Sequence, residues 1–311
     1  MADKEMRAVY CETLIRLAEK DKRIFVLEAD LMKASGTTPF RNAFPDRTIN
    51  AGVAEANMVG VAAGLSAGGK IPFAATFGCF ASRRAFDQFF ISANYAQLNV
   101  KLIGTDPGIT AAFNGGTHMP FEDMGLMRLI PGLSVMEPSD PVSLEKLLEL
   151  CAFHKGFIYM RLQRKPAPVI YKPEESFSLG KSKVLRDGKD LAIIALGVIM
   201  VDEALKAAEK LKEQGIDAAV IDILSLKPLD RELIINYASK TGHVITAENH
   251  QVSGGLGGAV AELLALEKPV PMAMVGIHDV FGEVGTQDWL QEHFRLTAEE
   301  ITLKARELMK K

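Results

Sequence analysis

Four groups of residues in this 311-residue chain carry side chains that could do chemistry. The first is Glu55, the one carboxylate in the small and apolar stretch "TINAGVAEANMVGVAAGL". If a helix begins near Val53, Glu55 shares a face with four apolar side chains. A carboxylate buried there needs a partner, whereas an acid in a first helical turn is favoured by the helix dipole. The stretch by itself leaves both interpretations open.

The second group is aromatic and lies in "TFGCFASRRAFDQF". Spacings of three and four predict that most of these phenylalanines are core residues. Phe77 and Phe80 differ because they come at the end of an expected strand, where open α/β sheets bind ligands. A flat ring at that position could stack on a heteroaromatic ligand.

The third group lies in the glycine-rich loop "GITAAFNGGTHMPFED", which contains Asn114 and His118. Histidine in a loop after a parallel strand is a candidate for proton transfer, because an ordinary imidazole titrates near neutral pH. The alternative is a surface histidine next to a local cap from Thr117.

The fourth group consists of two arginines, Arg7 at the start of the first expected helix and Arg161 at the end of the strand "FIYMRL". The guanidinium fork suits a phosphate or a carboxylate, although most surface arginines are only solvated. The run "SGGLGG" before a later helix could hold an anion, or could only permit tight packing.

Alternating strands and helices must position these side chains. Runs rich in Val, Ile and Phe predict strands at 24–30, 71–77, 100–105, 133–138 and 157–162, separated by helical periods at 6–21, 54–68, 81–97 and 140–156. After a proline-rich and charged break the alternation resumes, with strands at 191–198, 218–224, 243–249 and 272–277. This pattern predicts an α/β protein with two doubly wound, mostly parallel sheets. We expect domains at 1–172 and 190–311, joined by a linker at 173–189 that includes a short hairpin near 179–189.

Composition and local sequence limit the kinds of partner and the cellular compartment that we expect. The formal net charge of -3 argues against nucleic acid and anionic lipid as partners. No apolar run approaches the length of a membrane helix, and the charged N-terminus is unlike a secretory signal. Cys11, Cys79 and Cys151 are far apart and show no metal-ligand spacing, so no metal site is predicted. A cytoplasmic protein is expected.

In this order, the stretches resemble the C-terminal half of transketolase, a thiamine diphosphate enzyme. "NAGVAEANM", "GLSAGGKIPFAATFGCF", "NGGTHMPFED" and "IPGLSVMEPSD" are similar to its pyrimidine-binding domain. "VITAENHQVSGGLGGAVAELL" and "FGEVGTQDWL" are similar to its C-terminal domain. The resemblance covers the whole chain. It implies transfer of a two-carbon ketol unit from a ketose phosphate to an aldose acceptor.

The resemblance also implies roles for single residues. Glu55 corresponds to the glutamate that hydrogen-bonds N1′ of the cofactor's aminopyrimidine, and His118 to the loop histidine that contacts the oxygens of the sugar. Three further groups are implied: Phe80, Phe77 and Val53 against the pyrimidine; Asp30 near the cofactor and a dimer contact; and Arg7, Arg161, Asn114 and Ser35 around the substrate. Two positions depart from the family, since Asn114 replaces an aspartate that contacts the donor and Ala34 replaces the phosphate-site serine, with Ser35 beside it.

One expected segment is absent from the sequence. There is no GDG with a downstream Asn, the pattern by which this family binds Mg²⁺ and the cofactor's diphosphate. The resemblance therefore implies a split enzyme in which a companion N-terminal subunit holds Mg²⁺ and the diphosphate. An α2β2 assembly is expected, with the cofactor between the subunits.

Three alternatives remain open at this stage. A 1-deoxyxylulose-5-phosphate synthase has the same architecture, but it usually reads THQG where this chain reads "THMP" and has an arginine in place of Phe80. The β subunit of a 2-oxoacid dehydrogenase also lacks the diphosphate site, but "GGTHMPFED" fits it less well. A non-catalytic α/β scaffold is the third, against which Glu55 argues because a scaffold has no need of a carboxylate on an apolar face.

Overall fold

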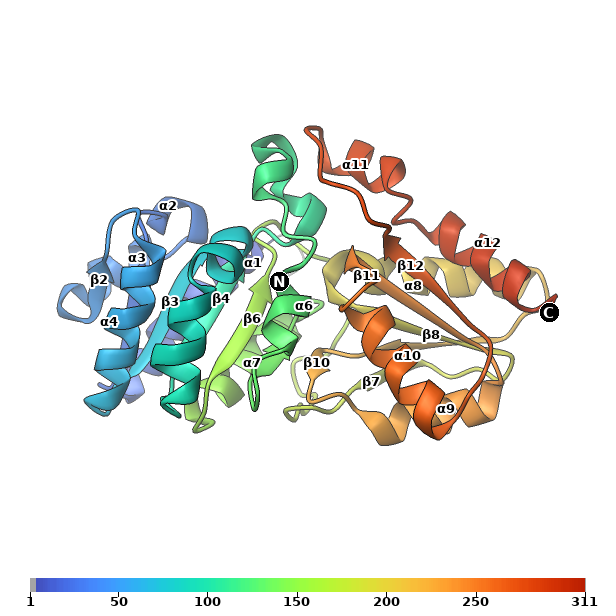
Figure 1. Ribbon diagram of the computed structural model, residues 1–311, viewed down its shortest axis with the longest axis horizontal. Coiled ribbons are helices and arrows are strands. Elements are labelled where there is room, and N and C mark those ends of the chain that lie inside the picture. The colour runs from blue at the N-terminus through green and yellow to red at the C-terminus, as the bar shows by residue number, and fades with distance from the viewer. Residues whose placement is uncertain (1–3, 311) are drawn as a thin grey trace.

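Two mostly parallel sheets, each covered by helices on both faces, form the structure, a computed structural model that describes residues 4–310 (Figure 1). The strand orders are β10-β5-β6-β4-β3-β1-β2 and β12-β11-β8-β9-β7. Only the edge pairs β10 with β5 and β7 with β9 are antiparallel among the described strands. The predicted fold class is confirmed, while the outermost residues of the two predicted domains, 1–3 and 311, lie outside the described range.

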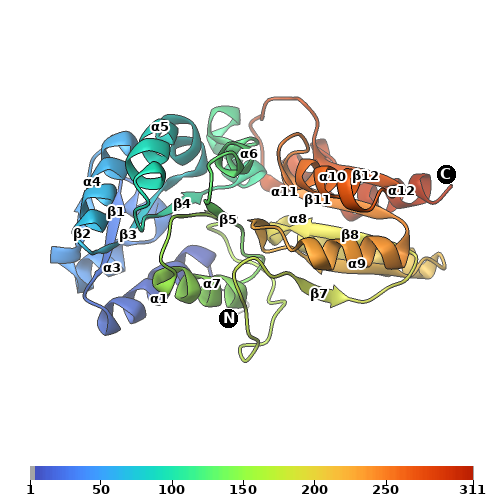
Figure 2. The same ribbon diagram turned by 60° about the horizontal axis from the view of Figure 1, so that its bottom comes forward.

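The first domain contains the elements that position most of the candidate residues. Its strands are β1 (Ile24–Glu28), β2 (Thr48–Asn50), β3 (Ile71–Phe77), β4 (Lys101–Thr105), β5 (Ser134–Met136) and β6 (Ile158–Leu162). Its α-helices are α1 (Met6–Lys20), α2 (Met32–Ser35), α3 (Thr38–Ala43), α4 (Glu55–Ala67), α5 (Phe86–Gln88), α6 (Asp123–Arg128) and α7 (Pro141–Phe153). Figure 2 shows α1 and α7 on one face of the sheet and α4 and α5 on the other.

The second domain repeats this layering. Its sheet contains β7 (Lys183–Arg186), β8 (Leu191–Leu196), β9 (Ala218–Asp222), β11 (Val244–Gln251) and β12 (Met272–Ile277), while β10 (Ser225–Lys227) joins the first sheet. Its helices are α8 (Gly197–Glu213), α9 (Arg231–Thr241), α10 (Leu256–Glu267), α11 (Gln287–His293) and α12 (Ala298–Leu308). Helices α8 and α12 pack together, as do α9 and α10. Within residues 4–310, no helix combines the length and the apolar surface needed to cross a bilayer.

Local sequence signals explain several helix boundaries. Asp140 accepts a hydrogen bond from the Ser143 amide at 2.6 Å and, with Pro141 in the first turn, starts α7. The predicted regular helix at 81–97 is wrong in detail. Two π-helical stretches, η2 (Phe80–Arg84) and η3 (Phe89–Tyr95), flank the short α5. Such wider turns often occur at functional sites.

The predicted linker also needs correction. No hairpin forms at 179–189 in the described chain, because β7 pairs antiparallel with β9 and so closes the edge of the second sheet. In return, β10 from the second domain pairs with β5 of the first. The exact domain boundaries remain predictions. Strand β10 of the second domain pairs within the first sheet, and apolar residues between β4 and α6 of the first domain pack in the core of the second.

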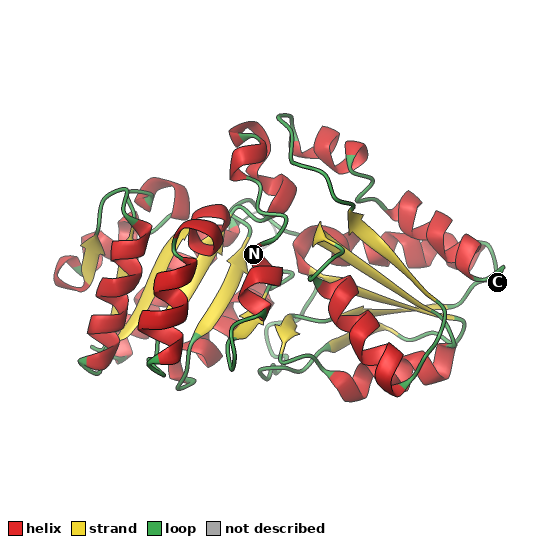
Figure 3. Cartoon of the chain, in the orientation of Figure 1, coloured by secondary structure: helices red, strands yellow, loops and turns green. Residues whose placement is uncertain are grey.

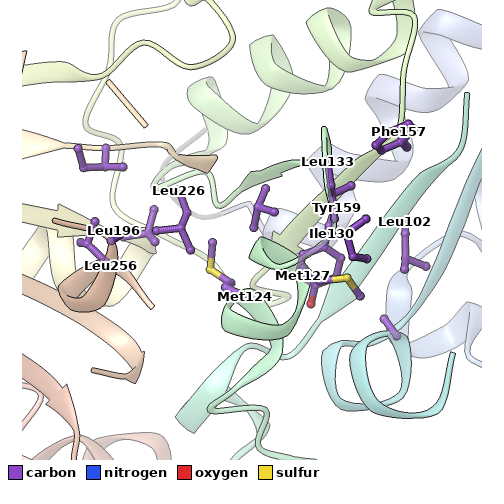
Figure 4. Packing of buried hydrophobic residues seen from close by; sticks show 14 of the residues in the cluster. Leu102, Met124, Met127, Ile130, Leu133, Phe157, Tyr159, Leu196, Leu226 and Leu256 are labelled. Atoms are coloured by element: carbon purple, nitrogen blue, oxygen red, sulfur yellow. The ribbon is translucent and has the colours of Figure 1, made fainter. Parts of the chain in front are cut away.

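Apolar packing continues across the junction of the two domains (Figure 4). Met124 and Leu133 of the first domain belong to the same buried cluster as Leu196, Leu226 and Leu256 of the second. In Figure 3 the arrowheads of the central strands of both sheets point to one edge of the molecule, where long loops gather. Loops at the carboxyl ends of parallel strands are the usual place for a ligand site in such sheets.

Candidate active site

Glu55 is the first residue of α4, and its side chain is 1% exposed. Arg84 donates from Nη1 to both carboxylate oxygens of Glu55, at 2.8 and 3.0 Å. The guanidinium of Arg84 also lies 4.2 Å from the centre of the Phe80 ring. Both interpretations of Glu55 therefore apply, because this residue lies in the first turn of α4 and its buried carboxylate has a partner, Arg84. The sequence analysis missed Arg84, although "SRR" stands directly after Phe80.

Two phenylalanines and the loop histidine form one half-buried aromatic group. The ring centre of His118 lies 5.3 Å from that of Phe80 and 6.1 Å from that of Phe77, both edge to face. Phe77 ends β3, and Phe80 starts η2 three residues later. The fold thus brings together three residues that the sequence analysis selected from separate stretches.

The loop between β4 and α6 presents His118. It contains two short 3₁₀ turns, η4 (Gly108–Asn114) and η5 (Gly116–His118). His118 Nδ1 and the hydroxyl of Thr117 are 2.9 Å apart, and Arg83 donates to the carbonyl of Thr117 at 2.7 Å. Asn114 is exposed at the end of η4. The loop is therefore anchored to η2 beside Phe80.

The amide of Arg7 donates to the carbonyl of Arg164, and the guanidinium of Arg7 already has hydrogen-bond partners. Its Nε and Nη2 donate to the carboxylate of Glu5 at 2.7 and 3.0 Å, and Nη1 donates to the carbonyl of Ala34 at 3.2 Å. Arg164, which the sequence analysis did not select, lies 5.3 Å from the Phe77 ring centre and donates to Asp106 at 2.6 Å. Each of these two guanidinium groups has an acidic partner.

Two predicted substrate contacts are wrong. Arg161 is 1% exposed, and its guanidinium donates to the carboxylates of Asp123 and Glu137 and to two backbone carbonyls, so it has no free fork for a phosphate. Ser35 is also 1% exposed and donates to the carboxylate of Glu28 at 2.6 Å. A side chain buried and hydrogen-bonded in this way is not available to bind a sugar.

Asp30 and Val53 lie at the carboxyl ends of β1 and β2. Asn50 joins their segments, since its Oδ1 accepts from the amides of Asp30 at 2.9 Å and Gly52 at 3.1 Å. Asp30 is exposed, and Val53 is 75% exposed. An apolar side chain this open, beside a buried carboxylate, is suited to contact with another molecule.

A buried polar cluster, defined here as Asp123, Arg161, Glu137, Glu248 and His250, lies under the His118 loop and was not predicted. Burial alone raises the pKa of Asp123, but the neighbouring Arg161 outweighs it and the net pKa is lowered. Burial, assisted by Arg161, lowers the pKa of His250 to about 4. A neutral His250 agrees with its contacts, because Nε2 accepts the amide of Gly125 at 3.2 Å. The polar run "AENH" at a strand end was the available signal.

The glycine-rich run at 253–258 does bind an acidic group, but that group, the carboxyl of Glu248, comes from the chain itself. The carboxylate of Glu248 accepts from the amides of Leu256 and Gly257, both at 2.7 Å, at the start of α10. A side chain at Gly255 would clash with Glu248. Burial nevertheless raises the pKa of Glu248 to about 8.

The chemistry of the Glu55 region fits one end of a heteroaromatic cofactor. A buried carboxylate can accept or share a ring proton, and the adjacent half-buried phenylalanines offer a flat apolar wall. Residues 4–310 contain no group of three potential ligands that could hold a metal ion. The structure thus offers a site for an aromatic ring, without a ligand set for a divalent cation among these residues.

Comparison with known proteins identifies the family of each domain. Residues 2–168 match the family described as "Transketolase, pyrimidine binding domain", and residues 180–301 match "Transketolase, C-terminal domain". The chain is 52% identical over 303 residues to the 6-deoxy-6-sulfo-D-fructose transketolase subunit SqwH of Clostridium sp. (strain MSTE9), covering 97% of this chain and 94% of the relative. It is 36% identical to one of the subunits of the apulose-4-phosphate transketolase of Phocaeicola vulgatus, covering 98% and 97%.

A solved structure has the same fold over nearly its whole length. It is described as a split gene transketolase, inactive beta4 tetramer, and aligns with a TM-score of 0.92 at 43% identity, covering 98% of both chains. The chain thus spans nearly the full length of each of these relatives. The chain belongs to the transketolase family, as the C-terminal subunit of a split enzyme.

Proposed function

We propose that this chain holds the pyrimidine end of thiamine diphosphate and, with a companion subunit, transfers a two-carbon ketol unit from a ketose donor to an aldose acceptor. The observation that carries the proposal is the meeting of Glu55, Phe80 and His118 in one half-buried group. Thiamine diphosphate supplies the nucleophilic carbon and the electron sink when it is bound. The chain's own residues bind, orient and move protons.

Glu55 holds or takes a proton at the pyrimidine ring in this proposal. Phe80, with Phe77 beside it, provides the wall for that ring, and His118 contacts the hydroxyl groups of the sugar. Arg84 now pairs with Glu55 and covers Phe80, so a ring on that wall displaces it. The side chain of Arg84 is 49% exposed and can turn toward solvent, but Glu55 is buried, so the ring that displaces Arg84 must itself hydrogen-bond the carboxylate.

A companion subunit supplies Mg²⁺ and the diphosphate site, which this sequence lacks. We propose that it docks over Asp30 and Val53, which are exposed beside the pyrimidine site. The proposed assembly is α2β2, in the cytoplasm. The tetramer of the structural relative, described as inactive with β subunits alone, supports the need for the companion. Full donor cleavage by the isolated chain with cofactor and Mg²⁺ would refute it.

The proposed donor is a ketose with an anionic terminal group. The guanidinium of Arg164 lies beside Phe77, the amide of Arg7 donates to the carbonyl of Arg164, and the carboxylates of Asp106 and Glu5 already occupy the two guanidinium groups in part. A terminal anion must therefore compete with an internal carboxylate. The names of relatives include a sulfonate-bearing and a phosphate-bearing sugar. A donor panel should contain both groups and an uncharged analogue.

The alternatives are less well supported. Relatives that match nearly end to end are named as transketolase subunits, and the aromatic wall retains Phe80. A scaffold without activity does not explain a buried acid whose partner, Arg84, also lies over the ring of Phe80.

Substitution of Glu55 by Gln in the reconstituted complex tests the catalytic role. The amide keeps the shape of the side chain but cannot take the proton, so donor cleavage should fall at least about 100-fold. Unchanged turnover would refute the proposal. Arg84→Met is the matched control, because it removes the partner of Glu55 without touching the carboxylate.

A further inference from the structure

We propose that Asn249, in the C-terminal domain, is a positioning residue that holds the His118 loop of the pyrimidine-binding domain in its active shape. The inference rests on the function proposed above. Asn249 lies on β11 and is 4% exposed. Its Oδ1 accepts from the amide of Ile109 and its Nδ2 donates to the carbonyl of Pro107, both at 3.1 Å. One side chain thus binds both sides of Gly108, at the start of the loop.

The backbone conformation at Gly108 fits closely against Asn249 of the other domain. Gly108 has φ +49, and any side chain there would clash with the amide of Asn249. Farther along the loop, Ala112 also has a positive φ of 48, although it is not glycine. Such backbone persists only where its surroundings impose it. Asn249 is one of the groups that impose it.

The other end of the loop is tied to the same strand. The amide of Gln251, two residues after Asn249, donates to the carbonyl of Phe121 at 2.7 Å. His118 lies between these two attachments. Gly116 is packed against the backbone of Gly282 so closely that a side chain would clash there. The C-terminal domain therefore contacts the loop before, beside and after the histidine.

The apolar side chains of the loop also pack against the C-terminal domain. Ile109, Ala111, Met119 and Phe121 belong to the hydrophobic cluster formed by β8, β12 and α8 of the C-terminal domain. The loop connects β4 and α6 of the first domain, but its buried apolar side chains pack in the hydrophobic cluster of the second domain. The C-terminal domain thus helps to set the backbone of the loop that carries His118, while the ring itself contacts Phe77 and Phe80 of the first domain.

A double-mutant cycle tests whether Asn249 acts through His118. In the reconstituted complex, Asn249→Ala should lower kcat/KM for the best ketose donor by about tenfold or more, whereas in the His118→Ala background the same change should cost less than about threefold. Equal losses in the two backgrounds would overturn the inference, as would unchanged activity of the single variant. An inactive wild-type complex would refute the proposed function instead.

Thr246→Val is the matched control, because Thr246 lies on the same strand, is equally buried, and its hydroxyl has no hydrogen-bond partner among residues 4–310. Activity of this variant should stay within about twofold of wild type. Hydrogen exchange on the isolated subunit gives a readout independent of turnover. Exchange of segment 107–121 should rise about tenfold in Asn249→Ala and stay unchanged in the control; equal exchange in both variants would contradict the inference.

If Asn249→Ala does not fold, Gly108→Ala attacks the same contact from the first domain. It should give the same loss of activity, and the same weak effect in the His118→Ala background. Wild-type activity in Gly108→Ala would overturn the inference, since a Cβ there cannot coexist with the observed Asn249 contact.

Discussion

Arg161 gives the sharpest test of the structure against the family resemblance. Its guanidinium compensates two buried carboxylates, with Nε 2.8 Å from Asp123 and Nη1 3.2 Å from Glu137. Arg161→Met removes this charge and leaves both acids without a cationic partner, although Asp123 keeps the hydrogen bond from the Tyr159 hydroxyl. Breaking a buried pair in this way costs about 3 to 5 kcal/mol. With an unfolding entropy of about 2.1 cal/mol/K per residue, such a loss lowers Tm by about 5 to 8 °C in a chain of this size.

Thermal unfolding of the isolated subunit measures this shift. Arg7→Met is the matched control, because Arg7 and Glu5 form a partly exposed pair whose loss should cost less than about 1 kcal/mol. With charged and uncharged donors, Arg7→Met should raise KM only for the charged one. Arg161→Met should affect both donors alike. An unchanged Tm for Arg161→Met, with a KM defect confined to the charged donor, would refute the buried placement. If the methionine variant does not fold, Arg161→Lys serves in its place.

Three further outcomes are expected. His118→Ala should lower donor turnover by about 100-fold while binding of thiamine diphosphate, measured by calorimetry, stays within about twofold; lost binding would contradict its placement. Glu5→Gln should lower KM about threefold for charged donors only, because it frees the fork of Arg7. Burial raises the pKa of Glu28 from 4.5 to about 7, so the folded state holds this proton more tightly and stability is lost as pH rises through that interval. Glu28→Gln should remove about 3 kcal/mol of the fall in urea-derived stability between pH 5 and 8; an unchanged fall would argue against the burial.

Features encoded by neighbouring residues were predictable from the sequence. Buried parallel strands appear as runs of branched apolar residues, and the cap of α7 needs only Asp140, Pro141 and Ser143. The two π-helical stretches have the same apolar pattern as a regular helix, so periodicity could not distinguish them. Ser35 and Glu28 are seven residues apart, and nothing in their spacing shows that they meet in the interior.

Arg161 and Arg164 show where prediction from sequence must fail. They are three residues apart at the end of one strand, yet one is buried and the other reaches the aromatic group of the candidate site. Arg161 is buried between the two domains, since its guanidinium donates to Asp123 and Glu137 of the first domain and, at 3.0 Å, to the carbonyl of Asn249, 88 residues later in the second. The C-terminal domain therefore contributes to the burial of Arg161, whereas Arg164 stays partly exposed. We propose Arg164 as the better candidate for the terminal anion, because its guanidinium lies 5.3 Å from the centre of the Phe77 ring.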